Sequence, residues 1–362
     1  MMIKRLCPWL ATALVAVALP TAGLAQGAPE VDKTVIRGDK ELRFCHLPNY
    51  RQEVLCGSHR VFEDRDAQSG RMIDIHFAVV PAVSEPAEPD PVVVFAGGPG
   101  QAATSLVGLI RPVFTDVLES RDVVLIDQRG MGKSHPLECE FPEFDLRDDP
   151  TAVEERSARQ LRACVDGWDA DPALYNQDLA NGDIHDIVTA LGYGKANLYG
   201  GSWGTRSALL YAHRYPDHVR SVILDGALPL ENPAPLYAAE DAERALHGLF
   251  DDCAADAACA DAFPDLEGDM QRAVARLEEA EASAADAAPR VDIPDPLTGA
   301  PVRAALDRET FGGLLRGLLY SPELGRLTPW LIHRAGEGDY RALAAATSYL
   351  TSSLADAMTP AT

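Results

Sequence analysis

One short segment constrains the fold of this 362-residue chain more than any other. Gly200, Ser202 and Gly204 form a Gly-x-Ser-x-Gly pattern. An apolar run, residues 195–199, precedes the pattern, and a segment with helical apolar spacing, residues 207–215, follows it. The sequence therefore predicts a strand, a sharp turn and a helix, with Ser202 exposed on a strained turn between small neighbours.

The strand before Ser202 has counterparts elsewhere in the chain. Continuous apolar runs at 92–95, 123–126 and 222–224 are typical of parallel strands buried on both faces. Helical segments lie between them, at 161–165 and 184–191, so we expect an α/β fold with a mostly parallel sheet. Earlier runs are expected to form antiparallel strands: 42–47, 54–62 and 72–80. In the last of these runs the alternation places His76 on an outward face, away from any catalytic role.

The region after residue 230 has a different pattern. It is rich in alanine, and its apolar residues recur at helical spacing. Expected helices cover 236–252, 266–282, 308–319, 323–334 and 340–356, with a loop rich in proline and aspartate at 289–301. The interpretation is a chain with three parts: a leader (1–25), an α/β core (26–230) and a helical cap region (231–362).

The leader has the composition of a secretory signal. Lys4 and Arg5 precede a short apolar stretch, residues 10–19, and small residues lie just before a cleavage point at Gln26. The stretch is too short to span a bilayer easily. We therefore expect a secreted or periplasmic protein that is not held in a membrane once the signal is removed.

Six cysteines follow the leader, and an even number in an exported chain predicts disulfide bonds. Proximity in the sequence favours Cys45–Cys56, Cys139–Cys164 and Cys253–Cys259. Their spacing does not match the ligand sets of zinc sites. The formal net charge of −23 disfavours nucleic acid as a partner, because phosphate binding needs clustered lysine and arginine.

Ser202 is the candidate nucleophile of an acyl-transfer reaction. Such a serine needs a base for its proton and amide donors for the negative oxygen of the tetrahedral intermediate. We expect the backbone N–H groups of Trp203 and Gly98 to be these donors. Residues 127–134 invite comparison with a phosphate-binding loop, but Asp127 stands where that pattern needs glycine, so we predict no nucleotide site.

The base and the acid are harder to place. In this class of site the chain order is serine, then a carboxylate, then histidine. Asp225 ends a predicted strand, although a capping or loop role is the more common one for such a residue. No histidine after Ser202 follows a late core strand. Two flank the far end of the helix after Ser202 and two lie on cap helices: His213, His218, His247 and His333.

At these motifs the chain resembles the serine aminopeptidases of the prolyl iminopeptidase type, an α/β-hydrolase family, and their exported tripeptidyl-aminopeptidase-like relatives. The matching segments are 97–101, 127–134, 200–205 and 211–219. The resemblance implies release of N-terminal residues or short peptides through an acyl-enzyme, with acidic cap residues holding the substrate ammonium. Four carboxylates near the start of the cap are candidates, though each could equally be a solvated helix residue: Glu231, Glu240, Asp241 and Glu243.

The resemblance also implies two further core strands after the cap, which carry the triad aspartate and histidine. We find no such strands before Thr362, so we expect a C-terminally truncated chain that lacks the acid and base and is poorly active alone, with an exposed apolar edge on its sheet. Two alternatives remain: an esterase on the same fold, and a non-catalytic binding protein. No metal or organic cofactor is implied, because a serine mechanism needs none.

Overall fold

The structure is a computed structural model that describes residues 33–139, 150–283, 290–294 and 301–346. The predicted leader lies outside the described residues, as does the end of the helix expected at 340–356. Strands and helices between residues 34 and 230 form a sheet covered by helices, and residues 238–346 are mostly helical, with an apolar cluster of their own. No helix of the described residues is long and apolar enough to cross a membrane.

Eight strands form one sheet, in the order β1-β2-β3-β4-β6-β5-β7-β8. The pairs β6–β5, β5–β7 and β7–β8 are parallel, whereas the pairs from β1 to β4 and β4–β6 are antiparallel. The sheet is therefore mixed, and the expected parallel pairing holds for its second half. The strands are β1 Thr34–Arg37, β2 Lys40–Cys45, β3 Val54–Phe62, β4 Met72–Val80, β5 Val92–Phe95, β6 Val123–Ile126, β7 Ala196–Gly201 and β8 Val219–Asp225.

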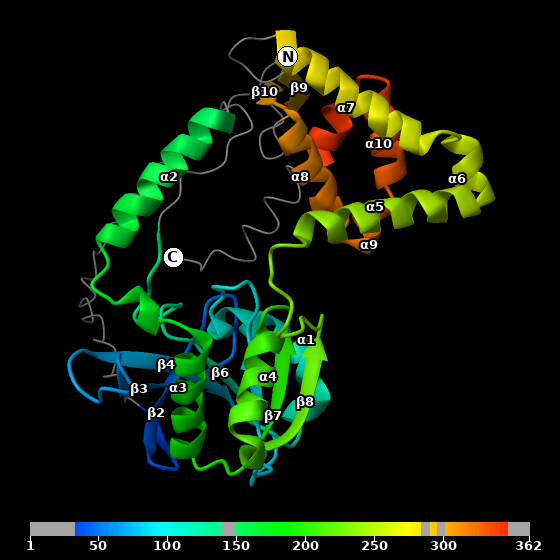
Figure 1. Cartoon of the computed structure of the whole chain (residues 1–362). Helices are drawn as coiled ribbons and strands as arrows, with labels where there is room; N and C mark the ends of the chain where they lie inside the picture. Colours follow the sequence, from blue (N-terminus) through cyan, green and yellow to red (C-terminus); the bar gives the residue numbers. More distant parts are fainter. Residues whose placement is uncertain (1–32, 140–149, 284–289, 295–300, 347–362) are drawn as a thin grey trace, which may run out of the picture. The chain divides into compact units, whose positions relative to one another are not determined.

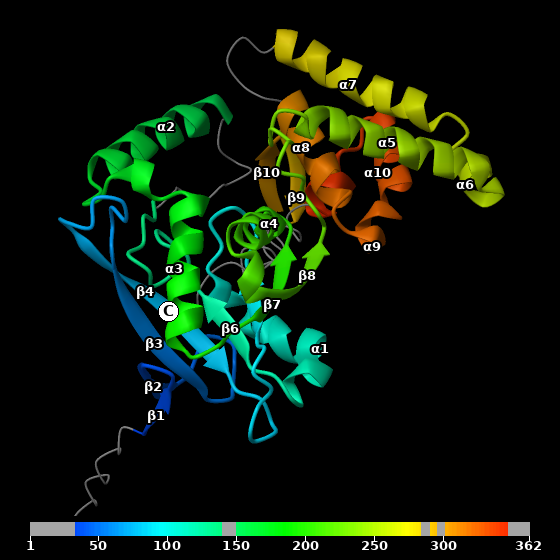
Figure 2. The ribbon, with the colours of Figure 1, turned by 60° about the horizontal axis from the view of Figure 1, so that its bottom comes forward.

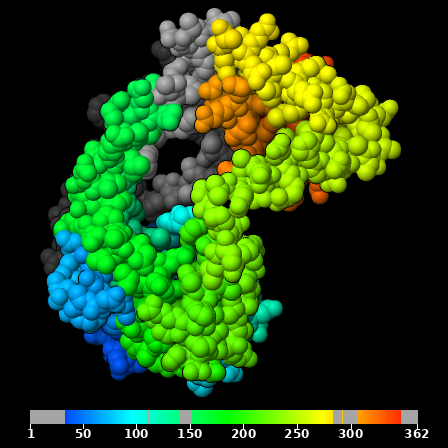
Figure 3. Space-filling model, viewed as in Figure 1, coloured from blue at the N-terminus to red at the C-terminus, as the bar shows by residue number. Residues whose placement is uncertain are grey.

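Helices cover both faces of this sheet, which explains the continuous apolar runs of β5 and β6. On one face, α3 (Gln177–Ala190) and α4 (Gly204–Arg214) pack against the strands (Figures 1 and 2). On the other face lies α1 (Val107–Leu118), which follows the short helix η1 (Ala103–Leu106). In the space-filling view, residues that include α3 and α4 form much of the green surface on this side of the molecule (Figure 3).

The strand β8 ends the sheet as the described residues define it. Its side chains are open to solvent: Val222 is 37%, Ile223 49% and Leu224 36% exposed. The apolar edge expected from the sequence is thus present. An edge of this kind leaves backbone N–H and C=O groups without strand partners, which makes it a place where other chain segments can pair.

The helical part is built around residues such as Leu277, Phe311 and Ile332. Its expected loop at 289–301 is wrong in part, because β9 and β10 pair there as a two-stranded antiparallel sheet. The helix expected at 323–334 is two helices, and Pro329 lies in the first turn of the second, where proline is well tolerated. The elements are α5 Ala238–Ala255, α6 Ala257–Ala262, α7 Leu266–Ser283, β9 Arg290–Pro294, β10 Pro301–Ala305, α8 Arg308–Leu318, α9 Pro322–Gly325 and α10 Thr328–Gly336.

All three disulfides expected from the sequence are present: Cys45–Cys56, Cys139–Cys164 and Cys253–Cys259. The first joins neighbouring strands β2 and β3. The second joins a loop to helix α2 (Pro150–Asp166), and the third joins α5 to α6. Each closes a short loop, so each restrains local structure rather than distant parts of the chain.

A buried ion pair holds several elements of the core together. Arg129, in the loop after β6, binds the Asp183 carboxylate of α3 through two nitrogens, at 2.7 and 2.9 Å. Both side chains are only 1% exposed. The remaining terminal nitrogen of Arg129 donates to the carbonyl oxygens of Glu63 and Leu174, at 2.7 and 2.8 Å. The guanidinium thus ties β6, α3 and two loops to one another.

Candidate active site

Ser202 occupies the sharp turn that the sequence predicts. It lies between the end of β7 and the start of α4, and its φ angle is +52°, in the left-handed region that side chains rarely adopt. Its backbone N–H donates to the carbonyl oxygen of Asp225 at 2.8 Å, which fixes the turn against β8. The residue is exposed, so its hydroxyl is accessible. A strained residue held this firmly is typical of a functional site.

The glycines on either side of Ser202 allow the backbones to approach closely. A Cβ placed on Gly204 would lie 2.0 Å from the carbonyl oxygen of Phe95 in β5. A Cβ on Gly200 would lie 2.6 Å from the carbonyl oxygen of Gly204. Both contacts are with backbone atoms, which cannot turn aside as a side chain can. The pattern therefore has a steric cause: α4 could not start directly above β5 if either residue had a side chain.

We expect Gly204→Ala to lower the free energy of unfolding by about 3 kcal/mol, at the upper end of the usual cost of overpacking. The added methyl group must displace backbone of the central strand β5. Urea denaturation of the purified protein measures the loss. Gly248→Ala is the matched control, because an added Cβ there meets nothing within 4 Å on helix α5. The control should be stabilising by up to about 1 kcal/mol through helix propensity, and equal effects of the two changes would contradict the steric account.

The glycine-rich loop after β5 lies against Ser202. A Cβ placed on Gly97 would be 3.2 Å from the Cβ and 3.7 Å from the Oγ of Ser202. The next residue, Gly98, has a φ angle of +106°, which is easily adopted only by glycine. The structure therefore brings this loop and the candidate nucleophile together, and the donor role of the Gly98 N–H stays a prediction. Trp203, whose N–H is the other expected donor, directly follows Ser202 at the start of α4.

Asp225, the candidate acid at the end of β8, is engaged by a tyrosine. The hydroxyl of Tyr199 donates to its Oδ2 atom at 2.6 Å. This hydrogen bond, together with partial burial, raises the pKa of Tyr199 to about 12. Asp225 also supplies the carbonyl oxygen that holds the N–H of Ser202. The residue thus holds the turn through its backbone carbonyl and binds strand β7 through its side chain.

No histidine of the described ranges is hydrogen-bonded to Ser202. His213 lies in the last turn of α4, at the opposite end from the serine, and His218 follows that helix with its Nδ1 atom 3.1 Å from the carbonyl oxygen of Gly194. In the helical part, the ring of His247 packs against Phe250. His333 is paired with Asp269, with 2.8 Å between Nδ1 and Oδ2. The base is therefore not identified among these four residues.

Two residues of α4 to which the sequence gives no role hold the segment that leads from β8 to the helical part. The Thr205 hydroxyl donates to the carbonyl oxygen of Ser202 at 2.6 Å and accepts the N–H of Leu228 at 2.9 Å. The Arg206 guanidinium donates to three carbonyl oxygens of this segment, at 2.7 to 2.9 Å, and lies over the ring of Trp203. The three acceptors are Pro229, Leu230 and Asn232. Nothing in the residue pattern predicts these contacts.

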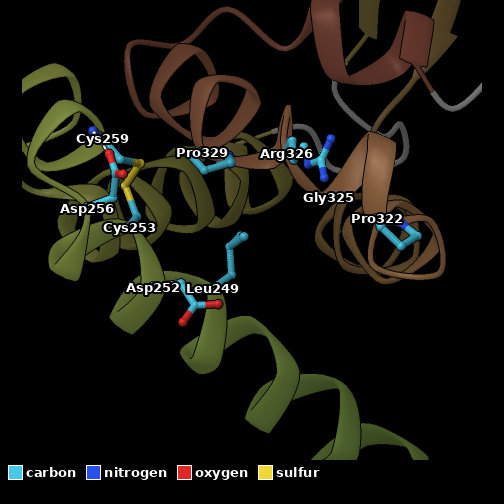
Figure 4. Close-up of a pocket in the computed structure, with 9 residues that line it drawn as sticks. All are labelled: Leu249, Asp252, Cys253, Asp256, Cys259, Pro322, Gly325, Arg326 and Pro329. Atoms are coloured by element: carbon cyan, nitrogen blue, oxygen red, sulfur yellow. Dashed lines mark hydrogen bonds between the residues drawn. A yellow bond between two sulfur atoms is a disulfide. The ribbon is translucent and has the colours of Figure 1, made fainter.

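The helical part has a pocket of about 390 Å³ between the α5–α6 corner and the start of α10 (Figure 4). Two carboxylates, Asp252 and Asp256, and Arg326 line it beside the Cys253–Cys259 disulfide. The four acidic residues expected to bind an ammonium group are not among its lining residues. Across the described parts of the chain, no group of three or more histidine, cysteine or acidic side chains is arranged to hold a metal ion.

Comparison with known proteins relates this geometry to proteins of known class. The chain is 30% identical to the serine protease Hip1 of Mycobacterium tuberculosis over 225 aligned residues. The aligned region covers 57% of this chain and 42% of Hip1. The chain is 32% identical to the proline iminopeptidase of Neisseria gonorrhoeae over 145 residues, 39% of this chain and 34% of the relative. A tripeptidyl aminopeptidase of Streptomyces lividans is 29% identical over 147 residues, 36% of this chain and 27% of the relative.

The chain thus spans less than half the length of the curated relatives it matches. A family model described as the alpha/beta hydrolase fold matches residues 90–308, more than half of the chain. The match includes the strand β5, the glycine-rich loop after it, the turn at Ser202 and most of the helical part. The fold, the strained serine and this match agree, and the chain belongs to the α/β-hydrolase fold family.

Proposed function

We propose that the protein is a serine hydrolase that forms an acyl-enzyme on Ser202. The observation that carries this proposal is the φ angle of +52° at an exposed serine between β7 and α4. In the proposed reaction Oγ attacks the substrate carbonyl carbon, and the N–H groups of Trp203 and Gly98 stabilise the oxyanion. The leaving group departs with the proton that the Ser202 hydroxyl gives up, and water then hydrolyses the acyl-enzyme, which returns a proton to the serine oxygen. We assign no residue of this chain to the base.

The substrate class that we propose is a peptide with a free N-terminus. Support comes from the relatives, which are named as a serine protease, a proline iminopeptidase and a tripeptidyl aminopeptidase. In this proposal, carboxylates of the helical part bind the substrate ammonium, and the candidates remain Glu231, Glu240, Asp241 and Glu243. An esterase activity at the same serine is the second candidate, because an ester needs the same nucleophile and oxyanion donors but no ammonium site.

We further propose that the protein is exported through a signal in residues 1–25. Three disulfides join all six cysteines that follow this segment. Such bonds form and persist in oxidising compartments such as the periplasm or the extracellular space. The mature protein would then act on peptides outside the cytoplasm. Sequencing the N-terminus of the purified, exported protein tests the cleavage point before Gln26.

The experiment that tests the substrate class compares three fluorogenic substrates: a tripeptide amide with a free amine, its N-acetylated form, and a butyrate ester. We expect release from the free amine to exceed release from the acetylated form by about 100-fold, since a lost ammonium–carboxylate contact leaves a charge unpaired. Equal release from both peptides would contradict an aminopeptidase. Hydrolysis of the ester alone would favour the esterase, and no turnover of any of the three would favour a binding protein.

A further inference from the structure

The polar loop after β6 is not explained by the proposed chemistry, although it carries one of the most distinctive motifs of the chain, residues 127–134. Asp127 begins this loop and is completely buried. Its carboxylate reaches across to η1, where Oδ1 accepts the N–H of Thr104 and Oδ2 accepts the Thr104 hydroxyl, both at 2.9 Å. Thr104 is itself 9% exposed. A buried carboxylate thus receives two donors from one residue of a different loop.

Thr104 ends the glycine-rich loop that touches Ser202. The loop starts at Gly97, in contact with the serine, and runs to the first turn of η1. An unpaired N–H at the start of a helix is well satisfied by a carboxylate, and hydrogen bonds to a charged acceptor are stronger than neutral ones. Asp127 therefore anchors the end of the loop whose other end carries the expected oxyanion donor, Gly98.

The position of Asp127 is in turn fixed by its own loop. The Ser134 hydroxyl donates to the Asp127 carbonyl oxygen at 2.7 Å and accepts the N–H of His76 in β4 at 2.8 Å. The N–H of Lys133 adds a longer hydrogen bond to Oδ2, at 3.3 Å. Ser134 has no exposed surface. Hydrogen bonds through Ser134 therefore hold Asp127 in a fixed position against strand β4.

The two loops also touch directly. Gly132 has a φ angle of +55°, and a Cβ placed there would lie 2.5 Å from Oδ2 of Asp127 and 2.8 Å from the Cβ of Ala102. A side chain at this position would push the carboxylate and the glycine-rich loop apart. The requirement for glycine at position 132 thus has the same cause as the Thr104–Asp127 contact, namely close packing of the two loops.

We propose that Asp127, acting through Thr104, is a positioning residue that sets the oxyanion-binding loop against Ser202. This inference rests on the proposed function, because it assigns a role to the loop that carries the Gly98 N–H. An oxyanion donor must lie about 2.7–3.1 Å from the oxygen it stabilises, and loss of one donor costs about 10²–10³-fold in rate. Loosening the anchor of the loop displaces the donor without removing it, so we expect a smaller loss, about 10-fold.

The test replaces the Thr104 hydroxyl with a methyl group, in Thr104→Val, which keeps the backbone N–H bond to Asp127, and restores the hydroxyl in Thr104→Ser. The readout is the rate at which a fluorophosphonate labels Ser202, because its phosphoryl oxygen occupies the position of the oxyanion. We expect the valine variant to react about 10-fold more slowly and the serine variant to recover the wild-type rate. Thr328→Val is the matched control: this buried threonine donates to the Leu324 carbonyl oxygen in the helical part at 3.2 Å. It should label at the wild-type rate.

A second readout separates positioning from general loss of structure. Hydrogen exchange of backbone amides 97–104 should become faster in Thr104→Val, while exchange of the α3 and α4 amides stays unchanged. If wild type is labelled and the valine variant is labelled equally fast, the positioning role is wrong and the proposed function stands. If wild type is not labelled at all, the proposed function fails and this inference fails with it.

Discussion

Replacing Ser202 with alanine will remove all turnover of a free-amine tripeptide substrate that proceeds through an acyl-enzyme, a loss of about 10⁴-fold or more wherever a base activates this serine. Loss of the nucleophile in a serine hydrolase leaves only the rate that binding and oxyanion stabilisation provide. The folded structure should be retained, because the change removes one exposed oxygen atom and leaves the turn around residue 202 intact. The measurement is kcat/KM with the fluorogenic peptide, after removal of contaminating peptidases.

Ser58→Ala is the matched control for this change. Ser58 is an exposed serine in the middle of β3, in a different part of the sheet. It should leave kcat/KM unchanged, so that any loss of activity in Ser202→Ala is attributable to the position and not to handling of a variant. Where the wild-type protein turns over the peptide, activity of Ser202→Ala within about tenfold of wild type would contradict a nucleophilic role for this serine.

Replacing Asp183 with alanine will lower the free energy of unfolding by about 3–5 kcal/mol. Asp183 neutralises Arg129 in a fully buried pair, and the arginine cannot move to solvent, because it is only 1% exposed and is also bound to two carbonyl oxygens. Removing the carboxylate leaves a buried positive charge without its closest partner. Urea denaturation followed by far-UV circular dichroism measures the effect.

Asp186→Ala provides the comparison. Asp186 lies on the same helix as Asp183, and its side chain, 38% exposed, binds Arg65 of the loop after β3 at 2.8 Å, whereas Asp183 binds both Arg129 and Arg65. An ion pair of this exposure contributes about 0–1 kcal/mol, since water competes for both charges. The two substitutions remove the same group from neighbouring turns of α3. Similar losses of stability in both variants would contradict the claim that burial of the Arg129–Asp183 pair causes the larger effect.

Much of the sheet could be predicted from local pattern. The strands β3, β4, β5 and β6 begin and end at the residues that their apolar runs predict. In these segments, either regular alternation of apolar and polar residues or a continuous apolar run indicates both the buried face of the strand and where the strand ends. The pairing of cysteines was also predicted, because each pair lies close in the sequence and short loops close at least entropic cost.

The helical part was predicted less well. Residues 290–294 lie inside the loop expected at 289–301 from its proline and aspartate content, yet they pair with residues 301–305 as two strands. Their conformation depends on cross-strand pairing, and the sequence of one strand does not indicate which segment it will pair with. Similarly, the break between α9 and α10 depends on Pro329, which can begin a helix as well as end one.

At the candidate site, the sequence predicts the position of Ser202 and the glycine-rich loop because both depend on local backbone demands. The anchors of that loop could not be predicted. Thr104 and Asp127 are 23 residues apart and belong to different loops. Their contact arises from the parallel arrangement of β5 and β6, which places the loops after both strands at one edge of the sheet. Threonine and aspartate have many common roles in turns, so neither residue signals this contact by itself.

The most direct test of the account is to treat the purified protein with a fluorophosphonate and locate the adduct by peptide mass spectrometry. The account predicts one modified residue, Ser202, in a peptide spanning the end of β7 and the start of α4, and no adduct in Ser202→Ala. An unmodified Ser202 under conditions that label an active serine hydrolase, or an adduct on another serine, would contradict the central claim that this strained residue is the nucleophile.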